Sequence, residues 1–190
     1  HRDDTGHLTA VRAALTWYPR EVWLYVMSGR WQRIAQVEAF VGRTAQVGDQ
    51  SGSRLVAAQI VHDVMHLALL QGRVYAPYAK WVGTAFARHE HGDELTEPLA
   101  AALAADSSDA RQDAVVAALL ELSRRQDRLG IASPVRSTAE TFFERPFPVI
   151  WCERIARSLH QQITRSDVAA MTFGLGGIDE ITTSTDALKN

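Results

Sequence analysis

One stretch of the sequence limits the fold more than any other. Residues 55–71 run for 17 residues without glycine or proline, and apolar side chains lie on nearly every side of the helix they would form. A helix that is apolar all round has to be covered by other elements. Gly72 follows at once and is a typical stop signal. The stretch therefore predicts a helix at the centre of a bundle.

The rest of the chain supplies helices to surround it. Apolar residues at helical spacing, proline at helix starts and glycine at helix ends predict further helices at residues 8–18, 19–46 (bent at Ser28-Gly29), 77–88, 98–105, 110–129 and 149–164. No segment shows a convincing strand alternation, and residues 131–147 read as irregular. We expect an all-α bundle of six to eight helices, a single domain over residues 1–190, with residues 1–7 and 178–190 peripheral.

Composition narrows the class of protein. A net charge of −2 argues against a general nucleic-acid binder, and no apolar run approaches the ~18 residues of a membrane span. The single cysteine, Cys152, excludes an internal disulfide, and its apolar surroundings predict a buried thiol. The sequence starts at His1 and has no signal-peptide pattern, so we expect a fragment of a cytoplasmic protein that lacks an N-terminal partner domain.

His62, Asp63 and His66 form the most evident candidate for metal chemistry. Two histidines four residues apart share one helix face, as two zinc ligands would. However, Asp63 stands where zinc proteases have glutamate, and residues 8–61 hold no further histidine. Packed histidines therefore explain this pattern better than ligands do. The polar stretch 89–94, with His89 and His91, would bind a metal only adventitiously.

A basic and aromatic group of residues is the strongest positive signal. Arginine forks suit phosphate or carboxylate, and aromatic rings suit a nucleobase. The alternative is that these rings belong to the core, with the cationic side chains beside them. We assign candidate ligand-binding roles to Arg33, Arg43, Tyr75, Tyr78, Lys80 and Trp81.

Stretches along nearly the whole chain carry a family resemblance, and residues 75–86 are the most specific of them. The others are residues 18–25, 31–36, 40–43, 48–53, 145–150 and 177–186. With these stretches the chain resembles an uncharacterised bacterial domain of unknown function that is found C-terminal to nucleotidyltransferase-like domains. The resemblance implies a helical domain similar to the C-terminal domains of nucleotidyltransferases, which close the active cleft and bind substrate. Its expected partners are that N-terminal domain and a small anionic or nucleotide ligand, without general nucleic-acid or membrane binding.

Three functions remain open on the sequence. The first is a substrate-binding or cleft-closing domain with no complete active site or cofactor of its own, whose full-length parent would use Mg²⁺ and a nucleotide. The sequence lacks a P-loop and a nucleophile elbow, and Gly52-Ser53 is not followed by the paired aspartates of nucleotidyl transfer. The second is a stand-alone helical module that binds a protein. The third is a metal-dependent hydrolase using His62, Asp63 and His66.

Overall fold

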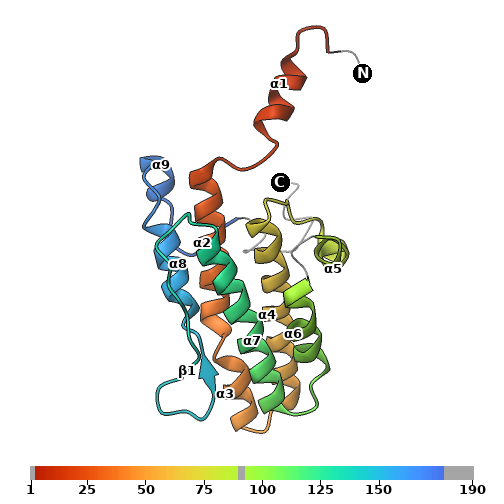
Figure 1. Cartoon of the computed structure of the whole chain (residues 1–190), viewed down its shortest axis with the longest axis vertical. Helices are drawn as coiled ribbons and strands as arrows, with labels where there is room; N and C mark the ends of the chain where they lie inside the picture. The colour runs from red at the N-terminus through yellow and green to blue at the C-terminus, as the bar shows by residue number, and fades with distance from the viewer. Residues whose placement is uncertain (1–2, 90–92, 178–190) are drawn as a thin grey trace.

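The computed structural model describes residues 3–89 and 93–177. Helix α4 (Gln50–Gln71) runs through the centre and packs against α2, α3, α5, α6 and α7, as Figure 1 shows. Its partners are α2 (Arg20–Val37), α3 (Phe40–Gln46), α5 (Val82–Ala87), α6 (Asp93–Ala104) and α7 (Ser108–Arg128). The predicted all-α bundle and its central helix are confirmed.

Helix α4 begins where its sequence supplies a cap. The Asp49 side chain accepts a hydrogen bond from the Gly52 N–H at 2.7 Å, which satisfies one of the donors left open at a helix start. The helix ends at Gly72, as predicted. Residues buried along α4 include Ile60, Val64 and Leu67 in addition to Asp63 and His66. The helix is therefore enclosed over most of its length.

Helix α2 is the second buried helix, and it packs most extensively against α8 (Cys152–His160). The Ser28 hydroxyl donates to the Ala156 carbonyl at 2.8 Å, and the Trp23 indole donates to the Leu70 carbonyl at 2.8 Å. These bonds satisfy polar groups that burial would otherwise leave without partners. Helix α2 is thereby fixed to α8 on one side and to α4 on the other.

The helix predicted over residues 19–46 is interrupted, but not at Ser28-Gly29. Helix α2 is continuous through these two residues, and the break lies at Glu38-Ala39, before α3. Gly29 permits a close tertiary contact, because a Cβ at this position would overlap the backbone of Gly176. The glycine allows residues 175–176 to cross directly over α2.

The break after α2 is stabilised from another part of the chain. The buried Glu38 carboxylate accepts hydrogen bonds from the backbone N–H groups of Ile150 (3.1 Å) and Cys152 (2.9 Å). Burial raises the pKa of Glu38, although these hydrogen bonds act against the rise. The carboxylate occupies the place of an N-cap for α8, since Trp151, the preceding residue, has a left-handed backbone.

Two short strands lie where the sequence predicts irregular structure. β1 (Glu140–Thr141) and β2 (Pro148–Val149) pair antiparallel, with Glu140 opposite Val149. Strands of two residues are too short to show an alternating pattern, so the sequence carries no signal for them. The turn between them lies beside α3, where the Arg145 guanidinium donates to the Gln46 side chain at 2.8 Å.

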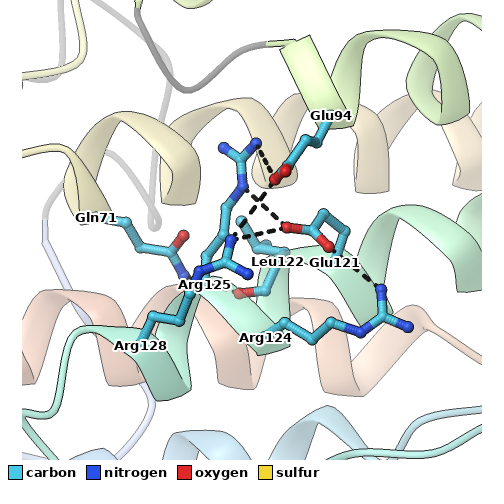
Figure 2. Close-up of polar contacts among 7 residues, drawn as sticks. All are labelled: Gln71, Glu94, Glu121, Leu122, Arg124, Arg125 and Arg128. Carbon is cyan, nitrogen blue, oxygen red and sulfur yellow. Dashed lines mark hydrogen bonds and ion pairs between the residues drawn. The ribbon is translucent and has the colours of Figure 1, made fainter.

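A network of charged residues joins α6 to α7 (Figure 2). Glu121 accepts from Arg124, Arg125 and Arg128 at 2.9–3.4 Å, and Arg125 also reaches Glu94 at 3.4 Å. Burial acts to raise the pKa of Glu121, but the hydrogen bonds from Arg128 and the other guanidinium groups outweigh it and leave the pKa lowered. These residues are therefore occupied with one another and support the bundle.

Helix α1 (His7–Ala14) stands away from the bundle (Figure 1), and none of its residues is buried within the described chain. Its base is held by aromatic rings. Tyr75 contacts both Trp17 and Tyr18 with ring centroids 4.8 Å apart, and its hydroxyl donates to the Leu15 carbonyl at 3.3 Å. We call Trp17, Tyr18 and Tyr75 the aromatic collar.

Within the described residues, no helix combines the length and the hydropathy needed to cross a lipid bilayer.

Candidate ligand-binding site

The six candidate ligand-binding residues fall into three places. Tyr75, Tyr78, Lys80 and Trp81 follow α4, at the end of the bundle that carries α1. Arg33 lies in the C-terminal half of α2, and Arg43 lies on α3, which precedes the first residue of α4. Helix α3 lies at the end of α4 opposite to α5 (Figure 1). Because α4 has 22 residues and each adds about 1.5 Å, the two ends are roughly 33 Å apart. One small ligand cannot contact both Arg43 and Trp81.

Residues 78–81 form the most exposed aromatic and cationic surface among these candidates. Tyr78 and Trp81 are 60% and 54% exposed, and the Lys80 ammonium lies 5.4 Å from the Trp81 ring centroid. The reason lies in the next helix, where only Val82 and Phe86 of α5 are buried. These two residues share a face and fix α5 against α4, so the preceding turn (η1, Ala79–Trp81) points outward.

The turn offers two kinds of interaction within a few ångströms. An exposed indole or phenol ring can stack on a planar ring, and a lysine ammonium attracts an anionic group. We call Tyr78, Lys80 and Trp81 the stacking turn. Tyr75 has a different role, because its ring packs in the aromatic collar and its hydroxyl is bonded to Leu15.

Arg33 takes part in a buried ion-pair cluster. Asp63 is fully buried, and its two oxygens accept from the guanidinium groups of Arg30 (2.9 Å) and Arg33 (3.0 Å). Burial acts to raise the pKa of Asp63, but the neighbouring His62 and the two arginines outweigh it and leave the pKa lowered. The Arg30 side chain is buried, whereas that of Arg33 is 31% exposed. Asp63 thus holds Arg33 in a fixed position at the surface of α2.

The ion-pair cluster includes Asp63, the central residue of the candidate metal site. The rings of His62 and His66 lie 4.5 Å apart, which confirms their shared face, but Asp63 between them is bound to two arginines. In residues 3–89 and 93–177, no three side chains of the metal-binding types gather at one point. Of the candidate stretch 89–94, residues 90–92 lie outside the described chain.

Arg43 and Cys152 have local explanations. The Arg43 guanidinium lies over the Phe40 ring, 5.3 Å from its centroid. Cys152 is fully buried, as predicted; burial first, and then the nearby Glu38 carboxylate, raise the pKa of its thiol well above the ordinary value. A thiol in this state is a poor nucleophile.

Comparison with known proteins adds one family match. Residues 1–82 match a domain of unknown function, DUF4037. The match ends at Val82, one residue beyond the stacking turn, and includes all six candidate residues. No curated protein and no solved structure was found that matches the chain. The expected likeness to a domain of unknown function is confirmed for this part, while its later stretches, at residues 145–150 and 177–186, lie outside the match.

The sequence analysis missed the roles of Arg30 and Glu38. Arg30 interrupts the apolar face of α2, and a charge in such a position indicates a buried partner. Glu38 stands at the end of the same helix, and no spacing rule connects it to residues 150–152. The sequence therefore carried a signal for the role of Arg30 but none for that of Glu38.

Proposed function

We propose that this chain is the helical, ligand-contacting domain of a nucleotidyltransferase-like protein, and that the stacking turn contacts a nucleotide. The observation that carries the proposal is the exposure of Tyr78 and Trp81 beside Lys80. Stacking on a base and attraction of a phosphate are the two interactions that a nucleotide offers. The resemblance of residues 75–86 to the nucleotidyltransferase-associated family supports the same assignment.

In this proposal the chain supplies binding and the catalytic groups belong to the other domain. Mg²⁺ and the reacting nucleotide would be held there, and the stacking turn would close over the substrate from one side. Arg33, held by Asp63, is a second candidate contact for an anionic group. Arg43 is left out of the ligand site, because α4 separates it from the stacking turn.

Tryptophan fluorescence tests the proposal. Trp23 and Trp31 are buried and Trp81 is exposed, so a nucleotide that stacks on the turn should quench mainly Trp81. We expect saturable quenching by ATP or GTP that disappears in Trp81→Phe and weakens roughly fivefold or more in Lys80→Ala. Arg43→Ala is the matched control and should bind as the wild type does. If millimolar nucleotide gives no saturable quenching, or if Arg43→Ala weakens binding as much as Lys80→Ala, the assignment is wrong.

A protein-interaction module is the second candidate, and exposed apolar residues favour it. Leu8, Val11 and Leu15 on or beside α1 are all exposed in addition to Trp81. Exposed apolar patches of this kind are typical of protein interfaces. The nucleotide titration separates the two, since a module of this second type would bind no nucleotide at the stacking turn.

A further inference from the structure

Helix α1 has an apolar stripe that the rest of the described chain does not cover. Leu8, Val11 and Leu15 follow one another at intervals of three and four residues, and therefore lie along one side of the helix. All three are exposed, and α1 projects away from the bundle (Figure 1). Covering a stripe of this kind with another apolar surface lowers the free energy in water.

The shortness of α1 is a second, independent reason to expect a partner. It has eight residues, and isolated helices shorter than about 12–15 residues are marginal in water. Its own support is a cap at the first turn, where the Asp3 carboxylate accepts from the Thr9 N–H at 2.8 Å. Contact with a partner would therefore stabilise α1.

The direction of α1 is nevertheless fixed. The ring contacts of the aromatic collar and the hydrogen bond from Tyr75 to Leu15 tie the base of the helix to the segment that follows α4. An N-terminal segment without a fixed orientation would lack these contacts. The collar holds α1 in one orientation, next to the segment that carries the stacking turn.

The charges around this end indicate what kind of partner it fits. Residues 3–25 and 72–89 hold five lysines and arginines and three acidic residues, Asp3, Asp4 and Glu21. Asp3 and Glu21 are already engaged, because they accept from the Thr9 N–H at 2.8 Å and from the Thr164 N–H at 2.7 Å. The basic residues, all exposed, are Arg12, Arg20, Arg73, Lys80 and Arg88. The complementary surface is an apolar strip bordered by acidic side chains.

We infer that α1 and the aromatic collar form a docking surface for a folded protein domain that presents such an acidic, apolar surface. The aliphatic stripe argues against a nucleic acid. A lipid surface is disfavoured because α1 itself carries one basic residue, Arg12, and no large aromatic side chain. The identity of the partner as the nucleotidyltransferase-like domain rests on the proposed function.

Amide hydrogen exchange of α1 tests this inference. In the 190-residue chain alone, the amides of α1 should exchange nearly as fast as those of an unfolded peptide. In the gene product at its full native length, we expect them to be protected by roughly tenfold or more. Equal exchange in both proteins, or a native product without a further domain, would overturn the inference.

Two variants make the test specific. The triple variant Leu8→Ser, Val11→Ser, Leu15→Ser should abolish the protection and leave the melting temperature of the bundle unchanged. The control is Val47→Ser, an exposed apolar residue at the opposite end of the bundle, which should keep α1 protected. Charge reversal at Arg12 and Arg88 to glutamate should reduce the protection in part. Protection that is lost equally in Val47→Ser contradicts a docking role for α1.

Other occupants give different outcomes. If α1 becomes protected only when phosphatidylcholine vesicles containing one quarter phosphatidylglycerol are added, the partner is a lipid surface and the inference is wrong. The result is also separable from the nucleotide titration. Weaker nucleotide binding by Lys80→Ala concerns the stacking turn, whereas protection of α1 concerns the docking surface, and either result can fail without the other.

Discussion

Among single residues, Asp63 has the largest expected effect on stability. It is fully buried and accepts from two guanidinium groups on the neighbouring helix, one of which, that of Arg30, is itself buried. Removing one member of a buried ion pair leaves the other charge without compensation, which is more costly than never having had the pair. The cluster is therefore sensitive to any change at Asp63.

Asp63→Asn should lower the free energy of unfolding at pH 7 by about 3–5 kcal/mol. Its lowered pKa implies that the stabilisation is complete above about pH 4, the unfolded value, and is lost as the pH falls through the folded value. Denaturant titrations at several pH values should therefore show wild type and variant converging in acid. Asp113→Asn, an exposed aspartate on α7, is the control and should change stability by less than about 0.5 kcal/mol. A loss at Asp63 that does not depend on pH would contradict the ion-pair explanation.

Replacing two helical glycines by alanine should change the stability of the protein in opposite directions. Gly29→Ala should destabilise the fold by about 1–3 kcal/mol, since the new methyl group would overlap the backbone of Gly176. Gly83→Ala, in a helix with open space around its Cα, should stabilise by about 0.5–1 kcal/mol because alanine loses less backbone entropy. Thermal unfolding of both variants checks the prediction. Equal effects would mean that residues 175–176 do not pack on α2.

At the scale of elements, the join between α2 and α8 depends on one side chain. Glu38 follows the last residue of α2 and accepts the backbone donors at the start of α8, so it links the end of one helix to the beginning of the other. Helix ends that are buried need such acceptors. Glu38 also fixes the strand pair, because β2 leads directly into residue 150.

Glu38→Ala should destabilise the protein by about 2–4 kcal/mol, because two buried N–H groups lose their acceptor. Glu38→Gln should destabilise the protein less than Glu38→Ala, because the amide carbonyl of glutamine can still accept a backbone hydrogen bond. The pKa of Glu38 is raised by burial, so its ionised form is the less favourable one in the folded state. The advantage of wild type over Glu38→Gln should therefore be largest below about pH 4.5 and decrease as the pH rises through the raised pKa. Urea unfolding across this range is the measurement, and an advantage that grows with pH would refute it.

The sequence predicts those elements whose stability is local. Helix α4 has continuous apolar faces and a stop at Gly72, and α7 begins at a Ser107 cap, so both follow from the sequence. The bend was misplaced because Gly29 serves a contact with Gly176, which lies far away in the sequence. The role of Gly29 could not be predicted without knowing that residues 175–176 pack on α2.

At the scale of the whole molecule, the bundle and α1 are energetically separate. The core includes residues of α2, α4, α6, α7 and α8, whereas α1 contributes no buried residue. The separation also explains why the candidate site was only partly predictable. The residue types were visible in the sequence, but the distance between Arg43 and Trp81 is set by the direction and length of α4.

Deleting residues 1–14 should change the melting temperature of the 190-residue chain by less than about 2 °C. The aromatic collar and the core both remain in this truncation. Circular dichroism before and during thermal unfolding is sufficient to test it. A drop of more than about 5 °C would show that α1 packs on the bundle and would weaken the case for a docking surface.

The packing of α2 against α8 also has a consequence for protein synthesis. Helix α2 is complete at Val37, but α8 begins only at Cys152, about 115 residues later. At roughly 5–20 residues per second, the ribosome needs on the order of ten seconds to make the missing partner. During that interval the face of α2 that packs on α8, around Ser28, has no permanent cover. The nascent chain is therefore exposed to aggregation for longer than its small size suggests, and chaperones that bind short apolar helices would act on it at this stage.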